Sequence, residues 1–170
     1  LIEEAKEAFI ISKMNLSYEK NAESRRWLDV ISAICDGDEA LLKYIQKIFG
    51  YFLTGLNIFR AVFFVRGDGP NGKTLLAETI NSLLGSYLAI INEVDDNQTF
   101  KSSNIKIISG GDTIGIYDKN HFIEYPSKAK LLMILNGYPN CDEFGESINE
   151  RIKIISLKKK FYDEERELFL

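Results

Sequence analysis

Continuous apolar runs alternate along the chain with stretches in which apolar residues recur every three or four positions. A short continuous run is typical of a strand buried on both faces of a parallel sheet, and the periodic stretches predict amphipathic helices. The predicted strands occupy residues 61–65, 88–91, 131–135 and 152–157. The predicted helices occupy residues 1–13, 22–34, 38–50, 76–84 and 97–108. This alternation predicts an α/β fold with a mostly parallel central sheet flanked by helices.

The first 55 residues carry only the helical pattern. Asp38 stands where an N-cap is expected, and we expect the helix that it opens to end near Gly50. No cluster of catalytic residue types occurs in this part of the sequence. We therefore assign residues 1–55 to a small N-terminal helical subdomain for packing or assembly, and residues 56–170 to the α/β domain.

Two short strand-like runs in the second domain flank Lys119 and Asn120. They cover residues 113–118 and 121–125, and together they predict a β-hairpin with a basic tip. From the residues alone, Lys119 and His121 are typical of an exposed turn. Further along, residues 137–140 predict a turn and residues 141–147 a polar loop.

Composition argues against a membrane-spanning protein, a secreted protein and a protein that coats nucleic acid. The 170-residue chain is 45% hydrophobic and 27% charged, as in an ordinary globular domain. No apolar run approaches the roughly 20 residues that span a bilayer, and no secretory signal pattern opens the chain. Cys35 and Cys141 match no metal spacing, which favours a reduced, intracellular setting. The formal net charge of −4 gives no overall basic field for coating nucleic acid.

The motif with the clearest chemistry is Gly67-Asp68-Gly69-Pro70-Asn71-Gly72-Lys73-Thr74, which fits the P-loop template without a mismatch. Its glycines let backbone N–H groups converge on a phosphate, and the helix that follows adds its dipole. Lys73 would reach the β- and γ-phosphates of ATP, and the Thr74 hydroxyl would ligate Mg²⁺. The motif stands between a predicted strand and a predicted helix, as phosphate binding requires.

Polar residues also follow the other predicted strands. Glu93 comes after residues 88–91 and is our candidate base for the attacking water, with Asp95 or Asp96 assisting the metal. Asn136 directly follows the predicted strand 131–135 and could touch the γ-phosphate or its attacking water. Arg151 precedes the last strand, and a lysine run, 158–160, follows it. Taken alone, such an arginine is usually a surface residue.

The order of these motifs resembles that of the superfamily III helicases, a branch of the ring-forming AAA+ ATPases. More narrowly, it is similar to the primase–helicase group of phages, plasmids and viruses, which includes the poxvirus-type proteins. The resemblance runs from Trp27 to Phe161 and rests on the stretches GDGPNGKT, NEVDD, IKIISGGD, LNGYP and ERIKII. Asn-Gly-Lys within the P-loop and the later Lys-x-x-x-Gly-Gly-Asp are more specific than a P-loop alone.

The resemblance implies a role for each motif residue in an ATP site. Lys73 and Thr74 would form the Walker A motif, Glu93 would be the Walker B carboxylate, and Asn136 would be sensor 1. Arg151 matches the arginine finger, which would complete the ATP site of a neighbouring subunit. The resemblance thus implies ATP and Mg²⁺ as ligands and a hexameric ring as the assembly.

The resemblance also implies contacts with DNA. The hairpin with Lys119 and His121 matches the loop that projects into the channel of related rings, and Lys106 and Asp112 fall in the motif that precedes it. The expected activity is that of an ATP-dependent DNA helicase domain acting on single-stranded or forked DNA. The resemblance further implies a primase–polymerase domain on the same protein, and the start at Leu1 rather than at Met leads us to expect that the chain is part of something longer.

Three features depart from the family pattern. Asn92 stands where Ser or Asp is common, and Glu150 stands where a second arginine is common. Only Ser86 and Tyr87 separate Gly85 from the next predicted strand, so we expect a segment between about 85 and 90 to be shortened or omitted. The sequence is also compatible with two other functions: a P-loop small-molecule or nucleotide kinase, and a catalytically impaired AAA+ assembly module.

Overall fold

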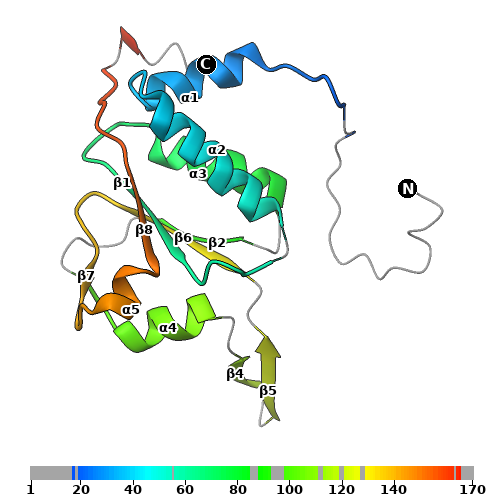
Figure 1. The fold of residues 1–170 in the computed structure, drawn as a ribbon, viewed down its shortest axis with the longest axis vertical. Helices are drawn as coiled ribbons and strands as arrows, with labels where there is room; N and C mark the ends of the chain where they lie inside the picture. Colours follow the sequence, from blue (N-terminus) through cyan, green and yellow to red (C-terminus); the bar gives the residue numbers. More distant parts are fainter. Residues whose placement is uncertain are drawn as a thin grey trace.

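A four-stranded parallel sheet forms the centre of the protein (Figure 1). The computed structural model describes residues 17, 19–54, 56–84, 88–92, 98–110, 113–118, 121–126, 129–162 and 164–165. The strands of the sheet, in spatial order, are β2 (Leu88–Ile91), β6 (Lys130–Leu135), β1 (Val62–Arg66) and β8 (Ile152–Ser156). All neighbouring pairs are parallel, which confirms the predicted sheet. The four continuous apolar runs correspond to these four strands.

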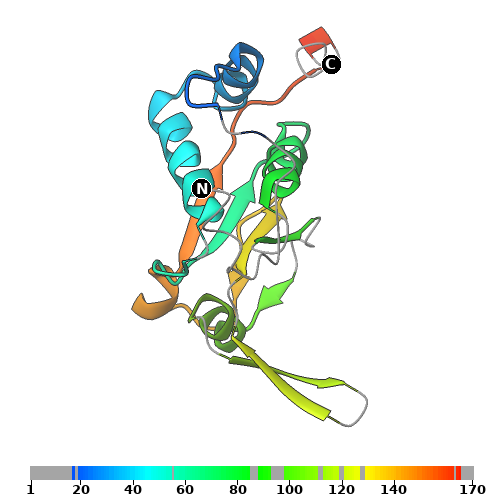
Figure 2. The ribbon, with the colours of Figure 1, turned by 90° about the vertical axis from the view of Figure 1, so that its right-hand side faces the viewer.

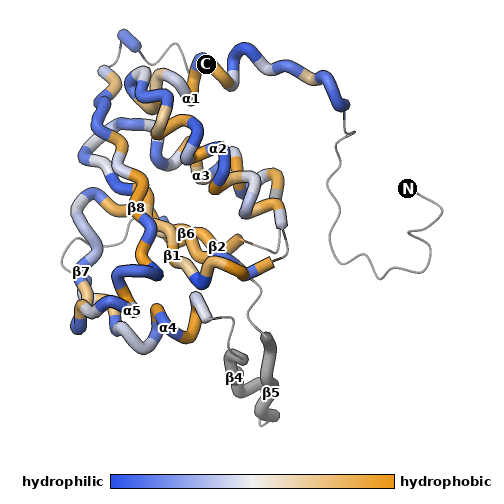
Figure 3. The backbone as a smooth tube through the Cα atoms, viewed as in Figure 1, coloured by the Kyte–Doolittle hydropathy of each residue, from blue (hydrophilic) through white to orange (hydrophobic). Residues whose placement is uncertain are grey.

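Alternate side chains of the central strands enter two separate apolar clusters. In β1, Phe63 and Val65 point to one face of the sheet, while Val62 and Phe64 point to the other. All four side chains are buried. Figure 3 shows the resulting concentration of hydrophobic residues in the sheet. Burial on both faces explains why β1 and β6 read as unbroken apolar runs rather than as alternating ones.

Helices cover both faces of the sheet, giving three layers (Figures 1 and 2). One face is covered by α1 (Arg25–Ile34), α2 (Glu39–Leu53) and α3 (Lys73–Leu84). The other face is covered by α4 (Ser102–Gly110) and the single turn α5 (Glu146–Asn149). Because α1 and α2 share one apolar cluster with α3, the N-terminal helices are packed directly onto the domain that carries the P-loop.

The two N-terminal helices begin at side-chain caps. Ser24 accepts a hydrogen bond from the backbone N–H of Trp27, and Asp38 accepts one from Leu41 at 2.9 Å. The second contact confirms Asp38 as an N-cap. The predicted end of this helix near Gly50 is wrong, because α2 continues to Leu53. Phe52 is fully buried there, with its ring 4.9 Å from that of Phe63, and such packing outweighs the roughly 1 kcal/mol that glycine costs in a helix.

Three short elements were not predicted. The helix expected from residue 97 begins only at Ser102, because β3 (Thr99–Phe100) pairs with β7 (Asn140–Cys141). Asp142 fixes this start, since its carboxylate accepts a hydrogen bond from the Ser102 N–H at 2.8 Å. The stretch 141–147, predicted as a polar loop, therefore contains the end of β7 and the start of α5.

The predicted hairpin is present and projects away from the three layers (Figure 2). Its antiparallel strands are β4 (Thr113–Asp118) and β5 (His121–Pro126), with Asp118 opposite His121. The helix predicted at residues 1–13 lies outside the described residues. Within the described part of the chain, no helix has the length and apolar character needed to cross a membrane.

Candidate functional site

The P-loop begins at the carboxyl end of β1, at the centre of the sheet. The Gly67 N–H donates a hydrogen bond to the Leu135 carbonyl at 3.3 Å, which fixes the start of the loop beside the end of β6. Gly69 and Gly72 adopt φ angles of +80° and +81°, which favour glycine. The loop then leads directly into α3, so that backbone N–H groups of the first turn face the same edge.

Two glycines are required by close contacts as well. A Cβ atom at Gly72 would lie 2.8 Å from the Cδ1 atom of Ile34, at the end of α1. At Gly67 it would clash with the Asn71 Nδ2 atom and lie 2.8 Å from the Leu157 carbonyl oxygen. The loop is therefore held between α1 on one side and the segment after β8 on the other.

Lys73 lies inside the loop and is only 7% exposed. Its ammonium donates hydrogen bonds to the carbonyl of Gly67, to that of Gly69 at 3.1 Å and to the Asn71 Oδ1 atom at 3.0 Å. Asn71 is 1% exposed, and its Nδ2 atom has no hydrogen-bond partner among the described residues. A buried ammonium and a buried amide donor beside a helix N-terminus fit a polyphosphate, whose oxygens accept hydrogen bonds.

The segment that follows β8 lies along the P-loop, which the sequence did not predict. Backbone hydrogen bonds join Leu157 N–H to the Arg66 carbonyl at 2.8 Å and Phe161 N–H to the Pro70 carbonyl at 2.7 Å. Between them, the Lys160 ammonium lies 2.6 Å from the Asp68 Oδ2 atom. This hydrogen bond and ion pair lower the pKa of Asp68 and raise that of Lys160. The only sequence signals were an acidic residue within a P-loop and the later lysine run.

Two of the other predicted site residues lie at the same edge of the sheet. Asn136 follows β6, whose last residue, Leu135, pairs with Arg66 just before the P-loop. Thr74 is in the first turn of α3 and is exposed. The structure therefore brings Lys73, Thr74 and Asn136 together at the carboxyl ends of β1 and β6, where α/β sheets bind ligands.

Several predicted residues lie outside the described part of the chain. Glu93, Asp95 and Lys119 are among them, and for His121 only the backbone at the start of β5 is described. In the described ranges, no group of three or more His, Cys, Asp and Glu side chains could hold a metal ion. The Mg²⁺ ligands and the DNA contacts at the hairpin tip therefore stay predictions.

Arg151 lies at the opposite edge of the sheet from the P-loop of its own chain. It immediately precedes β8, and its carbonyl accepts a hydrogen bond from the N–H of Val62, the first residue of β1. Its guanidinium donates to the Ser109 hydroxyl at 2.9 Å, on the face covered by α4. Lys106 is half-buried on the same helix. The structure does not bring Arg151 or Lys106 together with Lys73.

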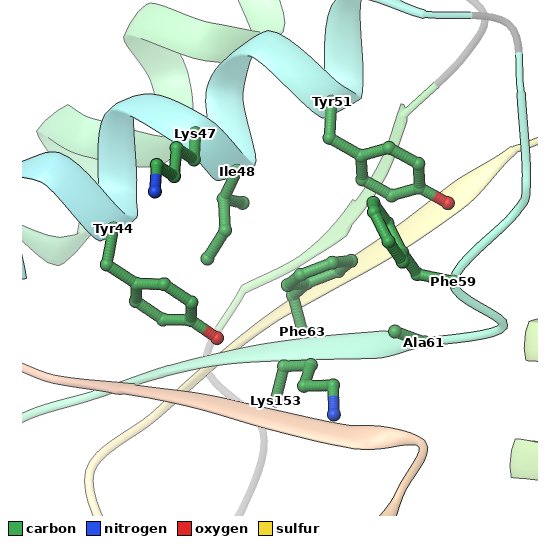
Figure 4. Close-up of a pocket in the computed structure, with 8 residues that line it drawn as sticks. All are labelled: Tyr44, Lys47, Ile48, Tyr51, Phe59, Ala61, Phe63 and Lys153. Atoms are coloured by element: carbon green, nitrogen blue, oxygen red, sulfur yellow. The ribbon is translucent and has the colours of Figure 1, made fainter.

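A cavity of about 310 Å³ lies between α2 and the amino-terminal half of β1, away from the P-loop (Figure 4). Its lining residues are Tyr44, Lys47, Ile48, Tyr51, Phe59, Ala61, Phe63 and Lys153. Burial raises the pKa of both tyrosines. Since β1 separates this cavity from Gly67, it forms no part of the phosphate-binding arrangement.

Solved structures of the C-terminal region of NrS-1 share this fold. Three of them superpose with TM-scores of 0.67, 0.65 and 0.64, each at 14% sequence identity. Each alignment covers 91% of this chain but only 44–45% of the other chain, so this chain spans less than half of its structural neighbours. No family model and no curated protein sequence matches the chain.

The likeness to these structures establishes the fold. The protein is an α/β domain with a parallel sheet flanked by helices, consistent with a P-loop NTPase-like core. At 14% identity, residue roles do not transfer from one chain to the other.

Proposed function

We propose that this chain is the ATPase domain of a superfamily III DNA helicase, part of a viral, phage or mobile-element primase–helicase. One observation carries the proposal: the buried Lys73 ammonium within a glycine-dependent loop, beside the end of β6 that carries Asn136. A triphosphate placed at this loop would meet the ammonium, the Asn71 amide and the N-terminus of α3. The sequence motifs that follow in helicase order support the more specific assignment.

In this proposal each residue has a separate task. Lys73 and the loop N–H groups bind the β- and γ-phosphates, and Asn136 orients the γ-phosphate or the attacking water. Glu93 accepts the proton of that water. Thr74 would hold Mg²⁺ together with Glu93 or Asp95, and Mg²⁺, when bound, would neutralise charge on the phosphate oxygens.

The arginine of one subunit would act on the nucleotide of the next. Arg151 lies at the far edge of the sheet from its own Lys73, so it cannot reach a phosphate bound in the same chain. This geometry supports a role in trans, within a hexameric ring. The projecting β4–β5 hairpin would carry Lys119 and His121 to DNA in the channel, and ATP hydrolysis would move it along the strand.

The decisive experiment measures ATP hydrolysis by the purified chain with and without single-stranded DNA. We expect DNA to stimulate hydrolysis, Lys73→Ala to abolish it, and Lys43→Ala, which changes an exposed lysine of α2, to leave it intact. Lys119→Ala with His121→Ala should remove the stimulation and keep the basal rate. Hydrolysis that never responds to DNA, or phosphate transfer to an added small acceptor by a monomer, would favour a kinase instead.

A further inference from the structure

The P-loop contains a carboxylate at a position where it opposes phosphate binding. Asp68 follows the first glycine of the loop, and 76% of its side chain is exposed. A phosphate chain bound at this loop carries several negative charges within a few ångströms of the loop backbone. An unpaired carboxylate there repels the ligand, and the repulsion is only partly screened by salt.

The segment after β8 supplies a cation to this carboxylate. The Lys160 ammonium lies 2.6 Å from Asp68 Oδ2, within the distance of a short charge-assisted hydrogen bond. The Lys160 stem lies over the loop, since its Cδ and Cε atoms would be 3.8 and 3.9 Å from a Cβ atom at Gly69. The next residue is anchored as well, because Phe161 N–H donates to the Pro70 carbonyl.

We propose that Lys160 is a positioning residue of the nucleotide site, which neutralises Asp68 and thereby allows the P-loop to accept a polyphosphate. The inference rests on the proposed function, since it assumes that a nucleoside triphosphate binds at Lys73. It makes Lys160, held beside the loop by the neighbouring Phe161 N–H contact, the third component of the site, beside the loop and the start of α3. Lys160 acts through Asp68 and needs no contact with the phosphates.

Two simpler roles of Lys160 predict a different effect on nucleotide binding when Asp68 is removed as well. If the ion pair only tethers the segment, removing either partner weakens nucleotide binding equally. If Lys160 binds phosphate itself, removing Asp68 as well brings no recovery. If it neutralises Asp68, the loss of Lys160 weakens binding and the additional loss of Asp68 restores it.

The test is a double-mutant cycle in which the affinity for a fluorescent ATP analogue with Mg²⁺ is measured at low ionic strength. We expect Lys160→Ala to weaken binding by about fivefold, the scale of one exposed charge interaction. Asp68→Asn should bind at least as well as the natural chain, and the double variant should return to within about twofold of it. The fivefold loss should shrink at high salt.

A matched control is the neighbouring lysine. Lys159 pairs with Glu165 at 3.2 Å rather than with the loop, so Lys159→Ala removes the same charge from the same segment and should leave affinity unchanged. Lys160→Gln keeps most of the stem and should weaken binding as Lys160→Ala does. Thermal unfolding without nucleotide should be alike for all variants, because the pair is exposed.

Five outcomes of this experiment support or overturn the inference. Recovery in the double variant supports the inference. A double variant as weak as Lys160→Ala, an Asp68→Asn variant as weak as Lys160→Ala, or a cycle with no effect at all would each overturn it while nucleotide binding by the natural chain stands. A natural chain that binds no nucleotide would overturn the proposed function, and this inference with it.

Discussion

The guanidinium of Arg151 donates a hydrogen bond across 2.9 Å to the hydroxyl of Ser109, joining the start of β8 to the last turn of α4. Ser109 is 1% exposed, and its hydroxyl also donates to the Ile105 carbonyl. Its own carbonyl accepts from Asn57, whose side chain accepts from the Tyr51 hydroxyl. These contacts link the two faces of the sheet around its amino edge, and α4 leads onward to the hairpin.

Replacing Ser109 tests how much this link stabilises the fold. Ser109→Ala removes the hydrogen bonds of the hydroxyl to the preceding turn of α4 and leaves the partly buried Arg151 without one acceptor. We expect the free energy of unfolding to fall by about 1–2 kcal/mol, measured by urea denaturation. Ser103→Ala is the matched control, since Ser103 is exposed on the same helix and alanine is the better helix former. Equal stabilities for the two variants would contradict the structural role.

The proposed trans role of Arg151 makes a prediction about mixtures of variants. Arg151→Ala should lower kcat by about a thousandfold, as expected when a transition-state arginine is removed, with little change in nucleotide affinity. Lys73→Ala should be inactive because its own P-loop is disabled. In an equal mixture, some interfaces pair an intact P-loop from one chain with an intact arginine from the other.

We therefore expect the mixture of Arg151→Ala and Lys73→Ala chains to hydrolyse ATP faster than either variant alone. Steady-state rates at constant total protein would show this. Arg26→Ala, which changes an exposed arginine of α1, serves as the control in both measurements. A mixture no more active than its components would contradict catalysis between subunits.

Replacing glycine by alanine should have opposite effects on stability in the P-loop and in α2. Gly72→Ala places a Cβ atom 2.8 Å from the Ile34 side chain on a residue with φ of +81°, so we expect destabilisation of about 1–3 kcal/mol. Gly50 lies within α2 with no atom near an added Cβ, so Gly50→Ala should stabilise by about 0.4–1 kcal/mol. Urea unfolding of both variants provides the comparison. A stabilising Gly72→Ala would refute the close approach of α1 to the loop.

The parts of the fold that could be predicted are those that leave a pattern in a short, continuous stretch of sequence. Burial on both faces leaves an unbroken apolar run, so β1 and β6 were identified with their boundaries correct to one residue. The Asp38 cap was found for the same reason, because a cap and its helix are adjacent. The P-loop was predicted as a phosphate site from eight consecutive residues.

The parts that were missed depend on residues far apart in the sequence. The pairing of β3 with β7, and the hydrogen bond from Ser102 to Asp142, join residues about 40 positions apart and leave no periodic trace. Lys160 lies 92 positions from Asp68, so a lysine run after a strand could not be assigned to the P-loop. The end of α2 was mispredicted for the opposite reason. Glycine does disfavour a helix locally, but the burial of Phe52 stabilises the helix beyond Gly50.

The environment of Cys35 predicts a thiol that reacts slowly. Burial, and secondarily the negative charge of Asp38, raise the pKa of Cys35 from 9.0 to about 11. At pH 8 only about one thiol in a thousand is then ionised, so alkylation by iodoacetamide should be slow in the folded protein. An unfolded chain ionises near pH 9 and the folded one near 11, so this group lowers stability as pH rises through that window.

Asp38→Asn separates the two causes, because asparagine keeps the N-cap of α2 while removing the charge. We expect the pKa of Cys35 to fall, yet to stay above its ordinary value since burial is the larger cause. Alkylation of Cys35, followed by peptide mass spectrometry across a pH series, should therefore quicken at pH 8. Asp29→Asn, on the exposed side of α1, should leave the rate unchanged. If Asp38→Asn leaves it unchanged too, the carboxylate does not act on the thiol, and burial alone protects Cys35.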